Sequence, residues 1–154
     1  MNNKIIFRRA VQADLSAIVH MLADDELGSQ RERDELPLFK NYIEAFEKID
    51  ADKNHELIVA EMHGEVIGTL HLIFLPSISY MGGTRSQVES VRVDSKYRSQ
   101  GIGAQMMAYA IERAKEHGAH VMQLTSHMTR KDAHRFYEKL GFQKAHVGMK
   151  LNLK

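Results

Sequence analysis

The fold of this chain is decided by the stretch Val91-Arg92-Val93-Asp94-Ser95-Lys96-Tyr97-Arg98-Ser99-Gln100-Gly101-Ile102-Gly103-Ala104. The alternating valines indicate a strand, the two glycines indicate a turn, and apolar residues at helical spacing follow. Such a turn suits an anion, because backbone without side chains and the unpaired N–H groups of a helix start can approach a phosphate. We therefore predict a phosphate-binding segment here, to which Lys96 and Arg98 add positive charge.

Patterns on both sides of this stretch predict alternating strands and helices. The expected elements, in order, are a strand around 5–7, a helix from 15 capped by Asp14, a mobile loop over 24–35, a helix with Pro37 in its first turn, a hairpin of 57–62 and 66–75, a flexible connection over 77–86, a strand over 88–93, a helix from 103 to a stop at Gly118, a strand over 121–124, a helix from 131 or 132 to Gly141, and a β-rich tail carrying Phe142, Val147, Met149, Leu151 and Leu153.

The composition is that of a single globular domain covering residues 1–154. The chain has 44% hydrophobic and 27% charged residues, and no apolar run reaches the roughly 20 residues of a membrane span. The formal net charge of +1 comes from interspersed charges, which argues against a nucleic-acid partner. There is no cysteine, so thiolate chemistry and disulfides are excluded. With no signal peptide or membrane segment apparent, we expect a cytoplasmic protein with no membrane partner.

Two glycines alone are weak evidence for a phosphate site, since any turn between a strand and a helix can contain them. The best-known nucleotide motifs do not fit. A dinucleotide fingerprint would have a third glycine or an alanine where Met106 stands, and a P-loop would have a lysine and a hydroxyl residue after a longer glycine spacing.

The segment Arg98-Ser99-Gln100-Gly101-Ile102-Gly103 resembles the Q/R-x-x-G-x-G/A signature of the GNAT superfamily of N-acetyltransferases. The preceding strand, the following helix and the later Ala133-to-Phe142 segment resemble the same family, over essentially the whole chain. The resemblance implies an α/β fold with a mixed, mostly antiparallel central sheet, flanked by helices and splayed at an acetyl-CoA site. It assigns the pyrophosphate to Arg98, Ser99, Gln100, Gly101, Ile102, Gly103 and Ala104, and the pantetheine arm to the main chain of Val91 and Val93.

Acetyl transfer to an amine needs a neutral nitrogen, so a nearby base is useful. Glu89 is the candidate base, because it lies on the strand before the turn, where several GNAT enzymes place a glutamate. The alternative is a solvated strand glutamate or a carboxylate that only binds substrate. Tyr137 occupies the family's tyrosine position and is the candidate proton donor to the departing thiolate; the alternative is an aromatic core residue. The N–H of Val91 is expected to meet the developing oxyanion.

The sequence departs from the family where an asparagine usually precedes the Phe-Tyr pair, since residues 129–134 contain none. We expect Arg130 or Lys131 to meet a phosphate instead, and Asp132 to cap the following helix. Asp132 and His134 are two apart on that helix and do not share a face, so no metal is expected. Arg85, with the loop over 80–84, is a further candidate lining of the acceptor pocket.

The predicted function is transfer of an acetyl group from acetyl-CoA to a primary amine of a small molecule. Direct transfer in a ternary complex is favoured, because there is no cysteine to hold the acetyl group and no serine triad is evident. The Asp132-to-Tyr137 segment resembles small-amine and aminoalkylphosphonate acetyltransferases. The alternatives are a protein N-terminal or lysine acetyltransferase and a non-catalytic acyl-CoA-binding module. Relatives often dimerise, so the resemblance also suggests a homodimer.

Overall fold

A computed structural model describes residues 3–154 of the chain. Helices and strands alternate along most of it, and two single 3₁₀ turns, η1 and η2, precede the helices α1 and α5. The elements are β1 (Ile6–Arg9), η1 (Gln12–Asp14), α1 (Leu15–Ala23), α2 (Glu26–Arg31), α3 (Lys40–Ala51), β2 (His55–Met62), β3 (Glu65–Pro76), α4 (Ser79–Gly82), β4 (Thr84–Val93), η2 (Ser95–Tyr97), α5 (Ile102–Glu116), β5 (Ala119–Gln123) and α6 (Lys131–Lys139).

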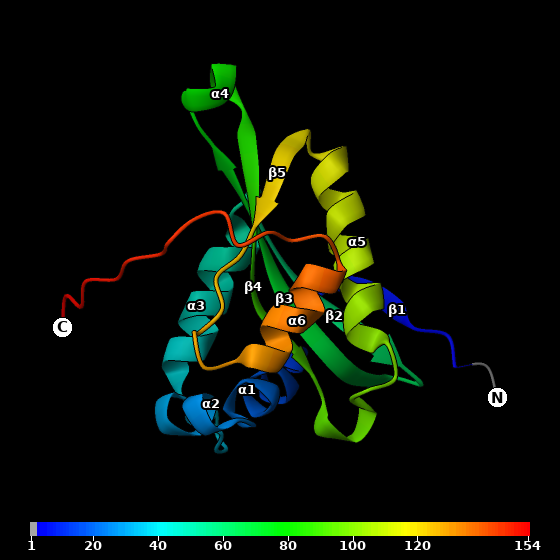
Figure 1. Ribbon diagram of the computed structural model, residues 1–154. Coiled ribbons are helices and arrows are strands. Elements are labelled where there is room, and N and C mark those ends of the chain that lie inside the picture. The colour runs from blue at the N-terminus through cyan, green and yellow to red at the C-terminus, as the bar shows by residue number, and fades with distance from the viewer. Residues whose placement is uncertain (1–2) are drawn as a thin grey trace.

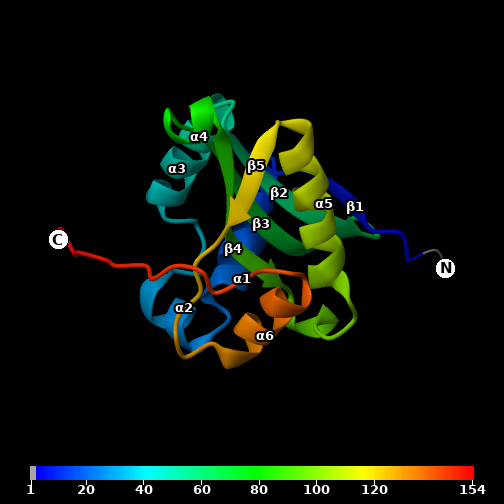
Figure 2. The same cartoon turned by 45° about the horizontal axis from the view of Figure 1, so that its top comes forward.

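The strands form one five-stranded sheet in the order of the sequence, from β1 to β5. The first four strands pair antiparallel, and β5 pairs with β4 in parallel after the crossover through α5. Figures 1 and 2 show the twisted sheet between α5 on one face and α1 and α3 on the other. The predicted fold class, a mixed and mostly antiparallel sheet flanked by helices, is confirmed.

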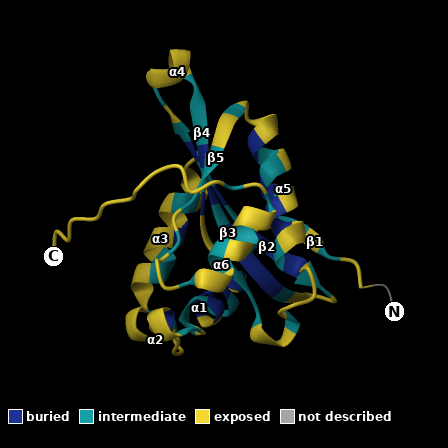
Figure 3. Ribbon diagram, viewed as in Figure 1, coloured by how far each residue is buried: buried dark blue, intermediate teal, exposed yellow. Residues whose placement is uncertain are grey.

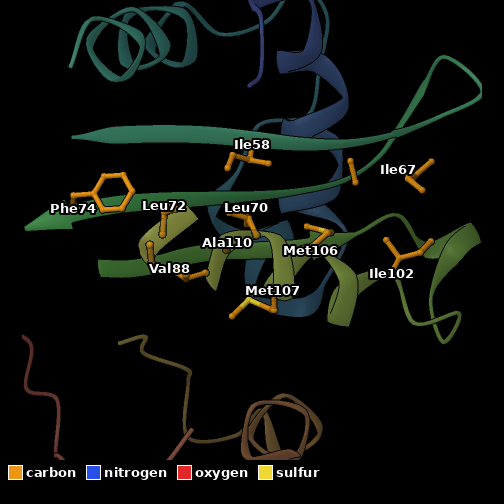
Figure 4. Packing of buried hydrophobic residues seen from close by; sticks show 12 residues of the cluster. Ile58, Ile67, Leu70, Leu72, Phe74, Val88, Ile102, Met106, Met107 and Ala110 are labelled. Atoms are coloured by element: carbon orange, nitrogen blue, oxygen red, sulfur yellow. The ribbon is translucent and has the colours of Figure 1, made fainter. Parts of the chain in front are cut away.

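Each face of the sheet has its own apolar core. The larger core lies between α5 and strands β2 to β4, and Figure 4 shows its side chains interlocking along the helix. The smaller core joins α1 and α3 to the other face, around Val59 and Phe46. Figure 3 shows the buried residues gathered along the sheet. Exposed residues lie on the outer surfaces of the helices, on α4 and on the C-terminal tail. This two-sided burial fixes the position of β4, which leads into the predicted site.

Several elements begin and end where the sequence indicates. The hairpin of β2 and β3 turns at His63 and Gly64, both at positive φ, as a two-residue hairpin turn requires. Gly118 and Gly141, also at positive φ, follow α5 and α6 closely. None of the helices within residues 3–154 is long and apolar enough to cross a membrane.

Other local predictions are wrong. The polar stretch after α1 contains the short helix α2, because the Asp25 side chain accepts a hydrogen bond from the N–H of Gly28 and so caps it. α3 starts at Lys40, after Pro37 rather than around it. Asp14 does not cap α1. Its carboxylate instead pairs with Arg8 and accepts from the N–H of Val11, a contact that belongs to η1.

Two segments project from the body. The connection between β3 and β4 is shorter than predicted, because β4 begins at Thr84 and only α4 and its flanks form an arm. The tail predicted to be β-rich is wrong as well: residues 143–154, all described, form no helix or strand and are exposed. Figure 1 shows this tail passing the end of β5 and leaving the body.

Candidate active site

The strands β4 and β5 part at one end of the sheet, and the predicted site lies in this opening. They pair only between 84–87 and 119–123. β5 ends at Gln123, whereas β4 continues to Val93. Within the described chain, the last half of β4 therefore has a strand on one side only. The main chain of Val91 and Val93, predicted to bind the pantetheine arm, belongs to this open edge.

A β-bulge in β4 determines which side chains face the same way. Glu89 pairs directly with His71, and Arg92 pairs directly with Thr69. Paired residues point to one face of a sheet, and residues 69 and 71 of β3 share a face. Glu89 and Arg92 thus share a face although they are three residues apart. The extra residue of the bulge, where Ser90 has a φ of 55°, makes this possible.

Glu89 lies where the two strands separate. Its Oε1 accepts a hydrogen bond from Nε2 of Gln87 at 2.6 Å, and Oε1 of Gln87 accepts one from Nε2 of Gln123 at 2.9 Å. This row of polar side chains runs from β5 across to β4. The Glu89 side chain is exposed at the opening. A carboxylate that is oriented yet accessible can accept a proton from a group entering from solvent.

The glycine turn joins the open end of β4 to α5. Gly101 has a φ of 79° and forms the N-cap of α5, and a Cβ placed on it would meet nothing within 4 Å. The space beside Gly101 at the start of this fifteen-residue helix is therefore open, and unpaired amides at a helix start suit an anionic group. The turn stays a predicted phosphate-binding segment.

Gly103, predicted to bind the cofactor, also has a role in packing. A Cβ on Gly103 would come within 3.3 Å of Cζ of Phe136 and 3.9 Å of Cγ2 of Val93. The glycine therefore allows α6 to approach the first turn of α5 closely. This contact helps to fix the position of Tyr137, the next residue on α6.

Arg98, predicted to bind phosphate, already contacts protein atoms. Its Nε donates to the carbonyl of Val93 at 3.3 Å, and its Nη2 lies 3.2 Å from Oδ2 of Asp24. The side chain thus ties the turn to the end of α1. Ser99 and Gln100 are exposed on the same turn.

Tyr137 lies on α6, with its ring packed edge-on against Phe136 and Phe142. Burial raises the pKa of its phenol, and the positive charges of Arg130 and Arg92 oppose this increase. The phenol therefore keeps its proton near neutral pH, as a proton donor must.

The opening carries more positive charge than the motif alone predicts. The Arg92 side chain is only 12% exposed, and its Nη2 lies 3.6 Å from Oδ2 of Asp25. Its Nε is buried and has no hydrogen-bond partner among the described residues. Burial lowers the pKa of Arg92, and the charges of Arg130 and Arg31 lower it further. The positive charges of Arg31 on α2 and of Arg130 at the start of α6 thus act on Arg92 of β4.

Two histidines on the neighbouring strands lie beside Glu89, which pairs with His71. Nδ1 of His55 and Nε2 of His71 are 2.9 Å apart, and Oδ2 of Asp52 is 3.8 Å from the far nitrogen of His55. Burial lowers the pKa of His71 to about 4, with a smaller effect of His55 in the same direction. His71 is therefore neutral at pH 7. It also lines a cavity of about 140 Å³ under α1 and α3, which is too small for a typical ligand pocket.

The remaining candidates lie outside this arrangement. His127 makes a local contact before α6, and His134 on α6 contacts the carbonyl oxygen of His127. No three metal-ligating side chains converge within residues 3–154. Asp132 pairs with Arg135 rather than capping α6, so the predicted cap is wrong. Arg130 and Lys131 line an open depression of about 300 Å³ at the start of α6. The arm after β3 lies at the far end of β4 from the glycine turn (Figure 1).

Four residues of this arrangement were not predicted from the sequence: Arg92, Gln87, Gln123 and His71. Alternation along the second strand of the predicted hairpin would have placed His71 on the face that it shares with Thr69. Arg92 had no such signal, because it reads as an outward residue of an alternating strand until the bulge is known.

A model of the acetyltransferase (GNAT) family matches residues 16–142. The chain belongs to the acetyltransferase (GNAT) family. Among GNAT relatives, the aminoalkylphosphonate N-acetyltransferase of Salmonella typhimurium is 35% identical over 98 residues, 62% of this chain and 61% of that protein. The chain thus spans less than two thirds of the length of this curated relative.

Solved structures of similar proteins agree with the family's fold. A protein described as a transcriptional regulator from Bacillus halodurans C-125 is 49% identical, with a TM-score of 0.94 over 97% of this chain and 100% of that one. A predicted acetyltransferase from Clostridium acetobutylicum, solved with acetyl-CoA, is 22% identical, with a TM-score of 0.74 over 97% of both chains. The second likeness concerns the fold alone.

Proposed function

We propose that this GNAT protein transfers the acetyl group of acetyl-CoA to the primary amine of a small molecule that also carries an anionic group. The observation that supports this best is the parting of β4 and β5, with Glu89 at the point of divergence. The open edge of β4 leads directly to the Gly101 turn, whose free space and helix amides fit a pyrophosphate.

The chemistry follows from the residues around the opening. Acetyl-CoA supplies an activated acetyl thioester, which an amine can attack only when its nitrogen is neutral. A free alkylamine has a pKa of ~10, so Glu89 accepts its proton, directly or through water. The N–H of Val91 donates to the carbonyl oxygen as negative charge develops on it. The new C–N bond replaces the C–S bond, the attacking nitrogen releases its second proton to solvent as the amide forms, and Tyr137 gives its phenolic proton to the sulfur.

Direct transfer agrees with the composition of the chain, which contains no cysteine to hold the acetyl group. Both reactants then occupy the opening together. Glu89 and Tyr137 act on different atoms: Glu89 on the amine and Tyr137 on the sulfur. The phenol regains its proton from solvent after the product leaves.

The arginines near Glu89 support an acceptor that carries an anionic group. Arg92 is largely buried, faces the same side of β4 as Glu89, and has an unpaired buried Nε. A buried donor without a partner is costly, and a guanidinium matches a phosphonate, phosphate or carboxylate well. Arg130 and Arg31 add positive charge nearby. The name of the Salmonella typhimurium relative, an aminoalkylphosphonate N-acetyltransferase, agrees with such an acceptor.

Calorimetry with acetyl-CoA tests the proposed cofactor site, and the chain contains a matched control. Gly101 and Gly118 stand at opposite ends of α5, both at positive φ, and a Cβ on either would meet nothing within 4 Å. Gly101→Glu should weaken binding by about tenfold or more, because a carboxylate would stand among the phosphates. Gly118→Glu introduces the same strain and charge and should bind normally. Equal affinity of both variants and the wild type would contradict the assignment.

Release of free thiol then tests turnover, using a panel of amines that do or do not carry an anionic group. A second candidate is a non-catalytic acyl-CoA-binding module, which the likeness to a protein described as a transcriptional regulator favours. Glu89→Gln and Tyr137→Phe separate the two. A module would bind acetyl-CoA and release no thiol above background with any amine, and neither substitution would change that result. A protein N-terminus or lysine as acceptor, and a cytoplasmic location, stay predictions.

A further inference from the structure

A row of polar side chains crosses three strands on the face of the sheet that α1 and α3 cover. It starts at Glu89 on β4, continues through His71 on β3 and His55 on β2, and ends at Asp52, the residue after α3. Nδ1 of His55 lies 2.9 Å from Nε2 of His71. Two imidazoles in contact beside an apolar core lose hydration, so packing alone does not account for them.

The row joins the proposed base to solvent. Glu89 pairs directly with His71, and paired residues on one face have Cβ atoms about 5 Å apart. Burial and then the charge of His55 lower the pKa of His71, and the charge of Glu89 opposes both, so the two side chains interact. At the other end, the side chains of His55 and Asp52 are 29% and 48% exposed. This end lies two strands away from the opening beside β4.

The proposed reaction needs such a route. An alkylammonium acceptor gives up two protons, one before it attacks the thioester and one as the amide forms. Glu89 can hold only one of them at a time. While acetyl-CoA and the amine fill the opening together, they restrict the exchange of protons between Glu89 and bulk water. A second route for its proton lets Glu89 act twice in one turnover.

The contacts favour one arrangement of the ring protons. Oδ2 of Asp52 lies 3.8 Å from Nε2 of His55, and its negative charge favours the proton on that nitrogen. Nδ1 of His55 then accepts a hydrogen bond from Nε2–H of His71, which leaves a free lone pair on Nδ1 of His71. The cavity of about 140 Å³ that His71 lines has room for a water molecule beside it.

We propose that His71 and His55 relay protons from Glu89 to solvent at Asp52, an inference that rests on the proposed role of Glu89 as the base. Protonated Glu89 gives its proton to Nδ1 of His71, directly or through a water molecule. His71 gives the proton on its Nε2 to Nδ1 of His55, and His55 gives the proton on its Nε2 to water beside Asp52. One proton leaves Glu89 and one reaches solvent, so both rings stay neutral. After the product leaves, exchange with water at both ends restores the starting tautomers.

The ring protons can be observed without turnover. Long-range ¹⁵N–¹H spectra of the purified protein should show both His55 and His71 with the proton on Nε2. In Asp52→Asn, where the charge is removed, His55 should shift toward the other tautomer. A proton on Nδ1 of His71 in the wild type would refute the relay, because that nitrogen could not accept from Glu89.

Kinetics then test the route itself, by thiol release at saturating acetyl-CoA. His55→Phe keeps a ring on β2 but has no nitrogen to carry a proton. It should lower kcat about tenfold or more and leave KM for the amine unchanged. His117→Phe is the matched control: the His117 side chain is 32% exposed and lies 3.4 Å from a carboxylate oxygen of Glu56, outside the row. Its kcat should equal that of the wild type.

Chemical rescue separates a relay from a structural role. Added imidazole should raise kcat severalfold in His55→Ala, where it can enter the vacated space, and should change neither His55→Phe nor the wild type. A loss of kcat through disturbed packing would not respond to imidazole. Full kcat in His55→Phe, or no rescue of His55→Ala, would overturn the relay and leave acetyl transfer standing. No thiol release by the wild type with any amine would overturn both.

Discussion

Replacing Arg92 by glutamine tests the idea that the acceptor carries an anionic group. Arg92 is 12% exposed, lies on the Glu89 face of β4, and has a buried Nε without a partner in the described chain. A hydrogen bond to a charged group contributes about 1.5–3 kcal/mol, and each 1.4 kcal/mol is a factor of ten. Since Arg130 and Arg31 remain, we expect kcat/KM for 2-aminoethylphosphonate to fall roughly 10- to 100-fold.

The assay follows thiol release with two acceptors that share an amine but differ at the other end. 2-Aminoethylphosphonate should lose activity in Arg92→Gln, whereas propylamine, which has no anionic group, should keep its low rate. Arg135→Gln is the control, because Arg135 is exposed and pairs only with Asp132 at the surface. Its kinetics should match those of the wild type with both acceptors.

A loss of stability would confuse the result, so thermal unfolding of each variant is measured alongside. Removing one member of a buried ion pair destabilises the fold when the other charge is left buried without a partner. Asp25, the partner of Arg92, stays 29% exposed and can be hydrated. Equal loss with both acceptors would show that Arg92 supports the fold or the acetyl-CoA site. No loss with the phosphonate would refute the anionic acceptor.

Three further predictions concern the chemistry, the pH dependence and the packing. Glu89→Gln and Tyr137→Phe should each lower kcat about 10²- to 10⁴-fold, with acetyl-CoA affinity by calorimetry unchanged. The folded pKa of His71, about 4, lies below that of the unfolded chain, so the unfolded state binds its proton first as the pH falls from about 6.5. The wild type should lose up to about 3 kcal/mol of unfolding free energy between pH 6.5 and 4 that His71→Gln does not lose, measured by urea denaturation. Gly68→Ala should destabilise by about 1–3 kcal/mol, because its Cβ would lie 2.6 Å from a buried methionine sulfur and 3.3 Å from a backbone oxygen. Gly148→Ala, with nothing within 4 Å, should leave Tm unchanged.

Each of these has a result that would count against it. Full activity of Glu89→Gln would make Glu89 a solvated strand residue, and weaker acetyl-CoA binding by Tyr137→Phe would make the phenol a ligand rather than a proton donor. Parallel pH profiles of the wild type and His71→Gln would exclude His71 as the source of the pH dependence. A Gly68→Ala protein as stable as the wild type would show that the helix above it can shift freely.

Local signals in the sequence predicted much of the fold. The hairpin around Gly64, the helix from Gly103 to a stop at Gly118 and the helix that carries Tyr137 all depend on turn chemistry and apolar spacing within a few residues. α2 was missed because one side chain, Asp25, caps a short polar segment that has no apolar period. The strand predicted for the tail was wrong for another reason: a strand needs a neighbour, and its sequence cannot say whether one is present.

The sequence by itself determined the family, the glycine turn between β4 and α5, and the candidates Glu89 and Tyr137, because each rests on residue types at fixed short spacing. Only the tertiary structure decided which side chains meet. The bulge at Ser90 brings Arg92 to the face of Glu89, although strict alternation would have separated them. Gly103 likewise became a packing residue once α6 lay across it. Both outcomes depend on contacts between distant segments, which residue spacing along one strand or helix does not encode.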